Sequence, residues 1–304
     1  MTKKMSKSEI ADLYKRLKPS IQKEFQPPYS LWAVKTSECT ITAYQSGKVL
    51  FQGNDLSWLE EDGNSSSSSK KSSAASSKSA SLESQVPSAG SDEVGTGDYF
   101  GPLTVAAVIV ETMEQAQALK NMGITDSKAL SDEFIRKAAP KIKEMVPYTI
   151  QILEPSLYNK TWRQPDQNLN WIKSQMHNKA YLNLQAKGNK LPSLKVVDQF
   201  CVPSSFYKHL RNTKEVLRDL HFETKAESKY IAVAAASVLA RNAFLECFDK
   251  MDEKYNFHFA KGGGSQADVC AKKFVEEFGW EEMPKVAKMH FSNTQKVRKA
   301  LGEL

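Results

Sequence analysis

The chain has 304 residues, of which 40% are hydrophobic and 25% are charged. This balance is typical of a globular protein, and the length allows two domains with sizeable cores. The 42 Lys and Arg residues outnumber the 35 Asp and Glu residues, which gives a formal net charge of +7. This modest excess favours a polyanionic partner such as nucleic acid, because phosphate neutralisation releases counterions.

Composition also excludes several classes of protein. No apolar stretch approaches the roughly 20 residues that a membrane span needs, and the first ten residues, MTKKMSKSEI, lack the apolar core of a signal peptide. We therefore predict a cytoplasmic protein with no membrane partner. The cysteines at 39, 201, 247 and 270 form no CxxC pair and suggest no zinc site, so reduced thiols are expected.

A serine-rich stretch divides the chain. Residues 63–84 read GNSSSSSKKSSAASSKSASLES, with no apolar periodicity. Such a segment buries too little surface to offset the entropy of ordering it. We predict an N-terminal domain over 1–62, a flexible linker over 63–86 and a larger domain over 87–304.

The small domain begins with a helical pattern over 6–25, in which Ile10, Leu13, Leu17 and Ile21 recur at helical spacing. Strand-like runs follow at 29–36, 38–45 and 48–54, and Ser46-Gly47 is suited to a tight hairpin turn between the last two. A short helix over 55–61 is also expected. The prediction is a helix followed by an antiparallel meander.

One face of this meander has the character of a nucleic-acid interface. Residues 1–53 contain nine Lys or Arg and four Asp or Glu, an excess of about five positive charges. Period-2 alternation places Tyr44, Lys48, Leu50 and Gln52 on one face. A basic, partly aromatic sheet face suits a nucleic-acid backbone. A solvated sheet face is an equally good interpretation of the same residues.

The large domain alternates strand and helix patterns, which predicts an α/β domain built on a central sheet. The expected helices include an Ala-rich one over 230–251 that is apolar on most faces and therefore buried. The strands are expected over 88–94, 103–111, 148–154, 194–200 and 220–224, and the other helices over 113–122, 131–146, most of 155–188, 204–212 and the C-terminal part, which 261–265 interrupts.

Four carboxylates lie at the margins of these apolar elements. Asp92 and Glu93 end the first strand, Asp198 ends another buried strand, and Glu227 precedes the Ala-rich helix. If the strand ends are neighbours, the four converge on one site, where their mutual repulsion favours a hard divalent cation such as Mg²⁺ or Mn²⁺. Two such ions about 4 Å apart are recurring machinery for phosphodiester hydrolysis. Taken singly, each acid could equally be a turn former or a helix-terminal charge.

Four blocks in the large domain carry a family resemblance. SDEVGTGDYFGPLTVAAV (91–108), TDSKAL (125–130), LKVVDQF (194–200) and TKAESKYIAVAAASVLAR (224–241) together resemble the type 2 ribonuclease H family, in the family's order. The resemblance covers nearly everything from about residue 88 onward. Within the family it points to the ribonuclease HIII branch, on three features: Thr96 where ribonuclease HII usually has arginine, Glu227 where it usually has aspartate, and the N-terminal domain with its ITAYQSGKVLFQG motif.

The resemblance implies an RNase H-like α/β fold, in which helices flank a central mixed sheet, beside a small N-terminal α+β domain similar to the TATA-binding protein. It also implies endonucleolytic cleavage of the RNA strand of RNA–DNA hybrids with Mg²⁺ or Mn²⁺, through two ions, leaving 5′-phosphate and 3′-hydroxyl ends. Asp92, Glu93, Asp198 and Glu227 match the family's catalytic, metal-binding acids. The expected partner is the hybrid, and the chain is expected to act as a monomer without an obligate protein partner.

The resemblance also assigns substrate contacts. RNA differs from DNA by its 2′-hydroxyl, which donates and accepts hydrogen bonds, and glycines permit close backbone approach. Backbone groups of Gly95, Thr96 and Gly97 are therefore expected to recognise the ribose. Because Thr96 removes a cationic contact, efficient cutting at a single embedded ribonucleotide is not carried over.

Ser127 and Lys128 are expected near the substrate backbone, although this block could simply cap a helix. The glycine-rich stretch 260–265 could face phosphate but fits a flexible surface turn better, and His290 fits a structural role.

Two other classes of function compete with catalysis. A non-catalytic hybrid-binding protein would keep the basic module but would not need all four acids. A nucleotide-binding loop at GTGDYFG lacks the lysine of a P-loop, and the acids before the glycines would repel phosphate.

Overall fold

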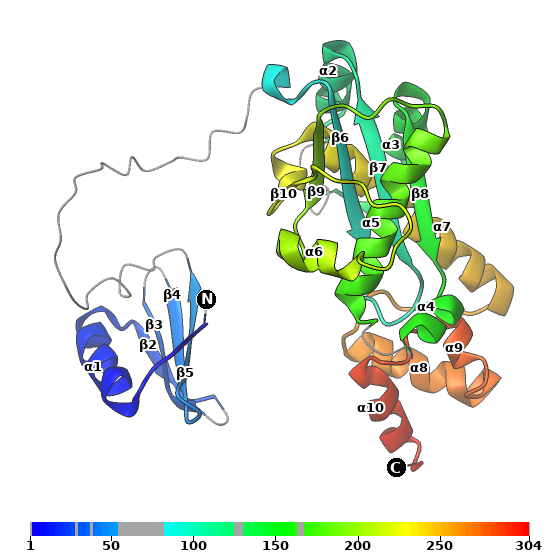
Figure 1. Ribbon diagram of the computed structural model, residues 1–304. Helices are drawn as coiled ribbons and strands as arrows, with labels where there is room; N and C mark the ends of the chain where they lie inside the picture. Colours follow the sequence, from blue (N-terminus) through cyan, green and yellow to red (C-terminus); the bar gives the residue numbers. More distant parts are fainter. Residues whose placement is uncertain are drawn as a thin grey trace, which may run out of the picture. The chain divides into compact units, whose positions relative to one another are not determined.

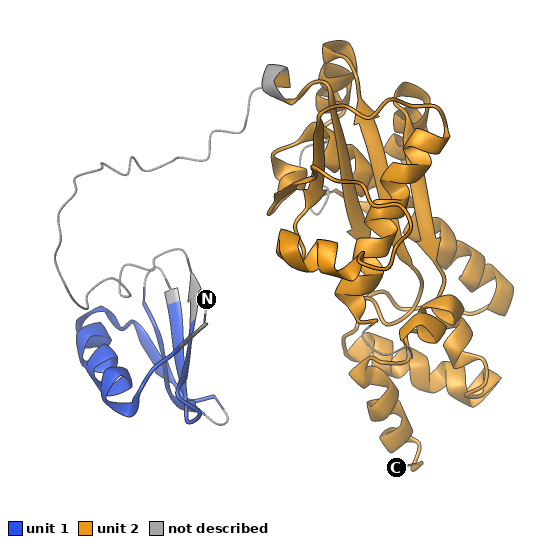
Figure 2. Cartoon of the chain, viewed as in Figure 1, with its two compact units in different colours: residues 1–75 blue, residues 76–304 orange. Residues whose placement is uncertain are grey.

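The computed structural model describes residues 2–27, 30–36, 39–53, 82–124, 130–162 and 167–303. The chain forms two compact units, residues 1–75 and 76–304 (Figure 2). The division falls inside the predicted linker, whose residues 63–81 lie outside the described part of the chain.

Unit 1 is an antiparallel sheet with one helix packed on a single face (Figure 1). Helix α1 (Lys7–Leu17) begins with a capping box at Ser6 and buries Ile10, Leu13 and Leu17 against the sheet. The sheet has the order β1-β5-β4-β3-β2, with β1 (Thr2–Lys4), β2 (Lys23–Phe25), β3 (Ser30–Lys35), β4 (Cys39–Tyr44) and β5 (Lys48–Gly53).

The predicted meander is correct, but the predicted helix over 6–25 is too long. Helix α1 ends at Leu17, and a 3₁₀ turn (Lys18–Ser20) containing Pro19 follows it. Proline lacks a backbone N–H, so Pro19 cannot continue the hydrogen bonding of α1, and the chain leaves the helix here and forms edge strand β2. Ile21 packs against the same core from outside the helix. The helix expected over 55–61 lies outside the described residues.

Unit 2 is built on a mixed five-stranded sheet, as predicted. Antiparallel strands β6, β7 and β8 form one side, while β9 and β10 run parallel to β6 on the other. Ser91 is paired with Val197, so the carboxyl ends of β6 and β9 meet at the same edge of the sheet. The order is β10-β9-β6-β7-β8, with β6 (Ser88–Val94), β7 (Leu103–Val110), β8 (Tyr148–Leu153), β9 (Leu194–Asp198) and β10 (His221–Glu223).

Helices cover both faces of this sheet (Figure 1). One face packs against α7 (Ile231–Tyr255), which α2 (Met113–Asn121) and α3 (Asp132–Met145) adjoin. The other face packs against α5 (Leu169–Ala186), which α6 adjoins. The remaining helices are α4 (Pro155–Trp162), α6 (Pro203–His209), α8 (Ser265–Phe278), α9 (Met283–Val286) and α10 (Ser292–Ala300), with short 3₁₀ turns at Leu82–Gln85 and Ala226–Ser228.

Helix α7 packs against the central strands β6 and β7 of the sheet. It approaches β6 so closely that a Cβ atom at Gly90 would lie 2.4 Å from the backbone nitrogen of Val233, a distance that only glycine tolerates. By length and apolar composition α7 could cross a membrane, so the expectation that no stretch reaches that length is wrong here. However, 83% of its most apolar window is buried within the protein, as predicted for a core helix.

Candidate active site

Asp92 and Glu93 are neighbours on β6, so their side chains leave opposite faces of the sheet. Asp92 turns toward α7, where it accepts a hydrogen bond from Ser237, and its Oδ1 accepts the backbone N–H of Glu93 at 2.7 Å. Only 6% of Asp92 is exposed. Burial, reinforced by the charges of Glu93 and Asp198, raises the pKa of Asp92 to about 8, although the Ser237 hydrogen bond acts in the opposite direction.

Glu93 turns toward α5 and meets two basic side chains there. Its Oε1 lies 2.5 Å from Nζ of Lys173, and its Oε2 lies 2.8 Å from Nε2 of His177. The other ring nitrogen of His177 lies 2.8 Å from the Ser91 hydroxyl. Burial alone would raise the pKa of Glu93, but the His177 hydrogen bond and the charges of His177 and Lys173 outweigh it, so the net shift is downward. Glu93 is thus held ionised.

Lys173 and His177 were not identified from the sequence. They are four residues apart and therefore share one face of α5, which is a signal that the sequence does contain. Their relation to Glu93 depends on how α5 docks on the sheet, and the local pattern does not give that docking. Both side chains are almost fully buried.

The other two predicted acids lie on β9, the neighbour of β6, and in the turn that follows β10. Asp198 ends β9, next to β6, and its Oδ1 accepts the backbone N–H of Ala226 at 2.9 Å. Glu227 follows Ala226 in a 3₁₀ turn and is 5% exposed. The structure therefore brings Asp92, Glu93 and Asp198 to one sheet edge and places Glu227 in the turn that Asp198 anchors.

A cavity of about 440 Å³ opens at this edge. Asp92, Glu93 and Asp198 line it together with the whole Gly95-Thr96-Gly97 loop, whereas Glu227 is not one of the described residues that line it. Among the described residues, no three His, Cys, Asp or Glu side chains already stand in metal-ligating positions. Asp92, Glu93 and Asp198 are gathered around one cavity, and each of the three also has a protein partner.

The glycine loop has the backbone geometry that the sequence suggested. Gly95 has φ +101°, and a Cβ atom there would lie 2.2 Å from the carbonyl oxygen of Pro102. Thr96 is half-buried and Gly97 is exposed, with open space where a Cβ would stand. Glycine is required at position 95 for conformation and packing, and Gly97 presents bare backbone to the cavity.

The stretch 260–265, expected as a flexible surface turn, is exposed at Lys261, Gly264 and Ser265 and also packs against the glycine loop. The Gly262 N–H donates to Oδ1 of Asp98 at 2.6 Å, and its carbonyl accepts the N–H of Tyr99 at 3.0 Å. A Cβ atom at Gly263 would lie 3.2 Å from the carbonyl oxygen of Gly97. The absence of a side chain at Gly263 allows the two backbone segments to lie side by side, which local sequence cannot distinguish from an ordinary turn.

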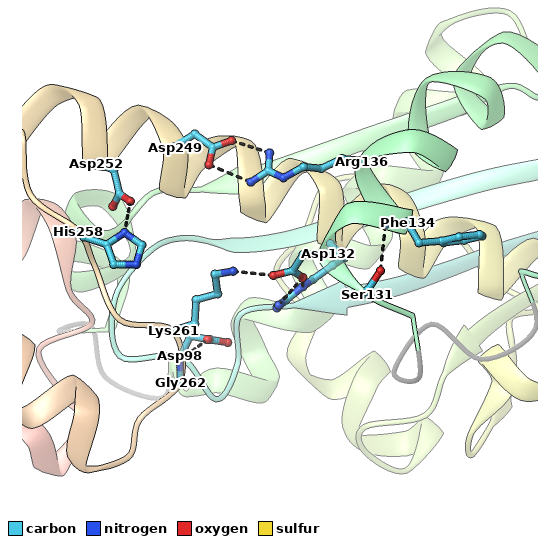
Figure 3. A network of polar contacts seen from close by, with 11 residues as sticks. Asp98, Ser131, Asp132, Phe134, Arg136, Asp249, Asp252, His258, Lys261 and Gly262 are labelled. Carbon is cyan, nitrogen blue, oxygen red and sulfur yellow. Dashed lines mark hydrogen bonds and ion pairs between the residues drawn. The ribbon is translucent and has the colours of Figure 1, made fainter.

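A basic cluster borders the same cavity, and Figure 3 shows Lys261 pointing toward Asp132 within a network of polar contacts. Asp132, the first residue of α3, accepts hydrogen bonds from Arg241 of α7 at 2.9 and 3.1 Å and from Lys261 at 2.5 Å. Burial would raise the pKa of Asp132, but these two cations lower it overall. Asp132 and Arg241 line the cavity, so positive charge stands opposite the carboxylates.

The remaining predicted substrate residues lie elsewhere. Ser127 and Lys128 lie outside the described residues. Tyr44 and Lys48 belong to unit 1, at the two ends of the hairpin turn, where Tyr44 is half-buried and Lys48 exposed. Since the paired Ala43 and Val49 face α1, their strand neighbours occupy the opposite, open face of the sheet.

That open face is basic. Lys23 and Lys35 are paired across β2 and β3, and both are exposed, as is Phe25. The intervening acid, Glu24, accepts a hydrogen bond from Tyr14 of α1 and therefore points to the helix side. The predicted co-member Leu50 is half-buried, while the Gln52 side chain lies outside the described part.

Two smaller sequence expectations concern histidine and cysteine. His290 stacks on Trp162 with ring centroids 3.8 Å apart, and burial lowers its pKa to about 4, so it is neutral at pH 7. Cys201, Cys247 and Cys270 are free thiols.

Comparison with known proteins adds independent findings. The family described as Ribonuclease HII matches residues 89–294, and a domain of unknown function (DUF3378) matches residues 2–76. Ribonuclease HIII of Bacillus cereus is 39% identical, over 97% of each chain. Two crystal structures of Bst-RNase HIII, one of a point mutant and one of a complex with Mn²⁺, are 32% and 31% identical over 98% of each chain, with TM-scores of 0.70 and 0.69.

Proposed function

The chain belongs to the ribonuclease HII family, within its ribonuclease HIII group, and from this premise we propose how its residues cleave the RNA strand of RNA–DNA hybrids. The family's enzymes are divalent-metal-dependent endoribonucleases. One observation carries the assignment of the site: Asp92, Glu93 and Asp198 line the same cavity as the Gly95–Gly97 loop. Reaction chemistry and ribose recognition would then share one cavity.

The donor set of this cavity fits a hard divalent cation. Its candidate ligands are carboxylate oxygens of Asp92, Glu93 and Asp198, joined by Glu227 from the turn that Asp198 anchors, and oxygen is the donor type that Mg²⁺ and Mn²⁺ prefer. Burial is the main cause of the raised pKa of Asp92, the charges of Glu93 and Asp198 add to it, and a bound cation would favour the ionised carboxylate. When bound, such ions, of which we propose two, would supply Lewis-acid stabilisation of phosphate charge and a more acidic water.

The chain's own residues prepare this chemistry. Lys173 and His177 hold Glu93 ionised and fix its direction. Asp198 and the Ala226 N–H tie the end of β9 to the turn that carries Glu227. We infer that cleavage leaves 5′-phosphate and 3′-hydroxyl ends, and that Asp92, Glu93, Asp198 and Glu227 all serve catalysis as metal ligands.

Arg241 and Lys261 are placed to meet the phosphates that flank the scissile bond. Both are held by Asp132 at the border of the cavity, and Lys261 is 40% exposed. An arginine fork suits phosphate oxygens, whereas a lysine acts as a point charge. With Ser127 and Lys128 as further candidates from the sequence, the substrate backbone would run past this border.

The glycine loop would select the RNA strand. Backbone groups of Gly95, Thr96 and Gly97 can approach a ribose without a bulky side chain intervening, and a 2′-hydroxyl can both donate to and accept from them. A deoxyribose would leave those backbone groups without a partner, which is the strongest basis for rejecting a substrate.

The open sheet face of unit 1 would add affinity for the duplex. It presents Lys23, Lys35 and Lys48 together with Tyr44 and the exposed ring of Phe25. Lysines and an aromatic surface suit a nucleic-acid backbone in a sequence-independent way. This gives the N-terminal domain of unknown function a substrate-binding role.

The site assignment is tested by single substitutions. Asp92→Asn, Glu93→Gln, Asp198→Asn and Glu227→Gln should each reduce hybrid cleavage by about 100-fold or more, because each removes a proposed metal ligand. Hybrid affinity measured without metal should change little. Glu253→Gln, an exposed residue of α7, is the matched control. Full activity in any of the four variants would remove that residue from the site.

We also infer that the enzyme acts as a monomer in the cytoplasm. The ordinary globular composition and the free thiols of Cys201, Cys247 and Cys270 support this. Light scattering of the purified chain and fractionation of the cells that express it test the two statements separately; a stable dimer or membrane association would refute them.

A further inference from the structure

Lys288 is a lysine buried beside the glycine loop. It is 1% exposed, and its Nζ donates to the carbonyl oxygens of Asp98 at 2.7 Å, Gly101 at 2.7 Å and Phe100 at 3.4 Å. All three acceptors belong to the segment that leaves the glycine loop and enters β7. A buried ammonium is costly unless it is fully hydrogen-bonded, so this arrangement calls for an explanation.

The segment that carries Lys288 is itself fixed. The Lys288 N–H donates to the Tyr99 carbonyl at 2.8 Å, and the Gly101 N–H donates to the Val286 carbonyl at 2.9 Å. From α4, the Asn159 amide donates to the Ala287 carbonyl at 2.8 Å. Lys288 therefore connects residues 98–101, through hydrogen bonds, to a segment that is itself held in place by α4.

The two ends of the glycine loop are held by different means. At the entry, Gly95 packs against the Pro102 carbonyl with no space for a side chain. At the exit, the Lys288 ammonium gathers three carbonyls onto one point. Between these anchors Gly97 is exposed to the cavity, so its position depends on both.

We propose that Lys288 is a positioning residue that sets the distance between the Gly95–Gly97 backbone and the ribose, and thereby the preference for RNA–DNA hybrid over DNA duplex. This inference rests on the proposed role of the loop in ribose recognition. Lys288 does not touch substrate; it acts through the carbonyls that it binds. Displacements of about 1 Å in such supports can cost roughly 100-fold in function.

The energetics support a positioning role over a purely stabilising one. Burial lowers the pKa of Lys288 to about 7, although the Asp98 charge acts in the opposite direction. The folded protein thus keeps an ionisable amine in a place where its charged form is disfavoured and where an apolar side chain of similar length would avoid that penalty. An apolar side chain has no N–H group, so it could not bind the three carbonyl oxygens and hold them close together.

The test is a ratio of affinities in the full-length chain. A fluorescent RNA–DNA hybrid and a DNA duplex of the same sequence are titrated without divalent metal, and the ratio of the two Kd values defines the hybrid preference. Lys288→Met should lower this preference by about tenfold or more, with the Kd for DNA duplex unchanged. Lys285→Met, an exposed lysine of α9 three residues earlier, should leave the preference unchanged.

Each outcome of the titration supports or overturns the proposed role of Lys288. A folded Lys288→Met protein with wild-type preference overturns it. If that variant does not fold, Lys288→Gln, which keeps an amide donor, is measured in the same way; failure of both to fold makes Lys288 a stability residue and also overturns it. A wild-type chain with no hybrid preference refutes ribose recognition by the loop itself, and is distinguishable because it appears before any substitution.

Discussion

Replacing Asp92 by asparagine should stabilise the metal-free protein while abolishing cleavage. The pKa of Asp92 is raised from 3.8 to about 8, so between these values the folded protein holds a proton that the unfolded chain has released. The Asp92 carboxyl therefore does not lower the free energy of unfolding below pH 3.8, and it lowers that free energy progressively as the pH rises toward 8. At about 1.36 kcal/mol per unit, the loss by pH 7 is on the order of 4 kcal/mol, and the side chain is too buried for strong solvent screening.

The assay is chemical denaturation of wild type and Asp92→Asn with a chelator present. We expect the variant to have the higher free energy of unfolding at pH 7 by about 3–4 kcal/mol, and the difference to shrink as the pH falls and to vanish below about pH 3, where the wild-type carboxyl is largely protonated in both states. Asparagine retains an oxygen that can accept the Glu93 N–H. A difference that is zero or negative at pH 7, or that does not depend on pH, would refute the reasoning.

Three further predictions concern parts of the chain that support the site. Lys173→Met should lower the free energy of unfolding by about 3 kcal/mol without metal, because it leaves Glu93 buried with one partner fewer; an effect below about 1 kcal/mol in denaturant titration would contradict this. Gly90→Ala should destabilise by more than about 3 kcal/mol, since its Cβ would meet the α7 backbone at 2.4 Å, and wild-type thermal stability would disprove it. Deleting residues 1–84 should weaken hybrid binding and flatten the dependence of log Kd on log salt, while the remaining domain stays folded by circular dichroism; unchanged affinity would mean that the open face of unit 1 is only solvated.

The convergence of the acids could be predicted because it depends on regular features. Asp92 lies near the carboxyl end of apolar strand β6 and Asp198 ends β9, and parallel pairing of those strands places their carboxyl ends at one edge. The glycine loop could also be predicted from the sequence, because the positive φ of Gly95 is a backbone conformation that favours glycine. Where a local pattern has one dominant structural solution, sequence reasoning succeeds.

The supporting contacts around the site could not be predicted, because they depend on how separate elements dock. Lys173 reaches Glu93 across the α5–sheet interface, and Lys288 reaches Asp98 from the far end of the chain. In the sequence, Gly90 looks like a glycine that only weakens a strand; the structure shows that it allows the close contact between β6 and the backbone of α7. Such contacts join residues many tens of positions apart, so no local periodicity reports them.

One error arose where a local pattern had two physical solutions. The apolar spacing up to Ile21 fits a longer helix, but Pro19 ends α1 and Ile21 reaches the same core from a different conformation. The contact of Gly263 with the Gly97 carbonyl could not be predicted either, because a surface turn has the same local pattern whether or not another segment packs against it.

The most direct test of the proposed activity uses a hybrid with a separate fluorescent label on each strand. With Mg²⁺ or Mn²⁺ we predict cuts in the RNA strand only, with 5′-phosphate and 3′-hydroxyl ends, an intact DNA strand, and no cleavage when a chelator removes the metal. Cleavage of the DNA strand, RNA cleavage that persists in chelator, or tight hybrid binding without any cleavage would contradict it.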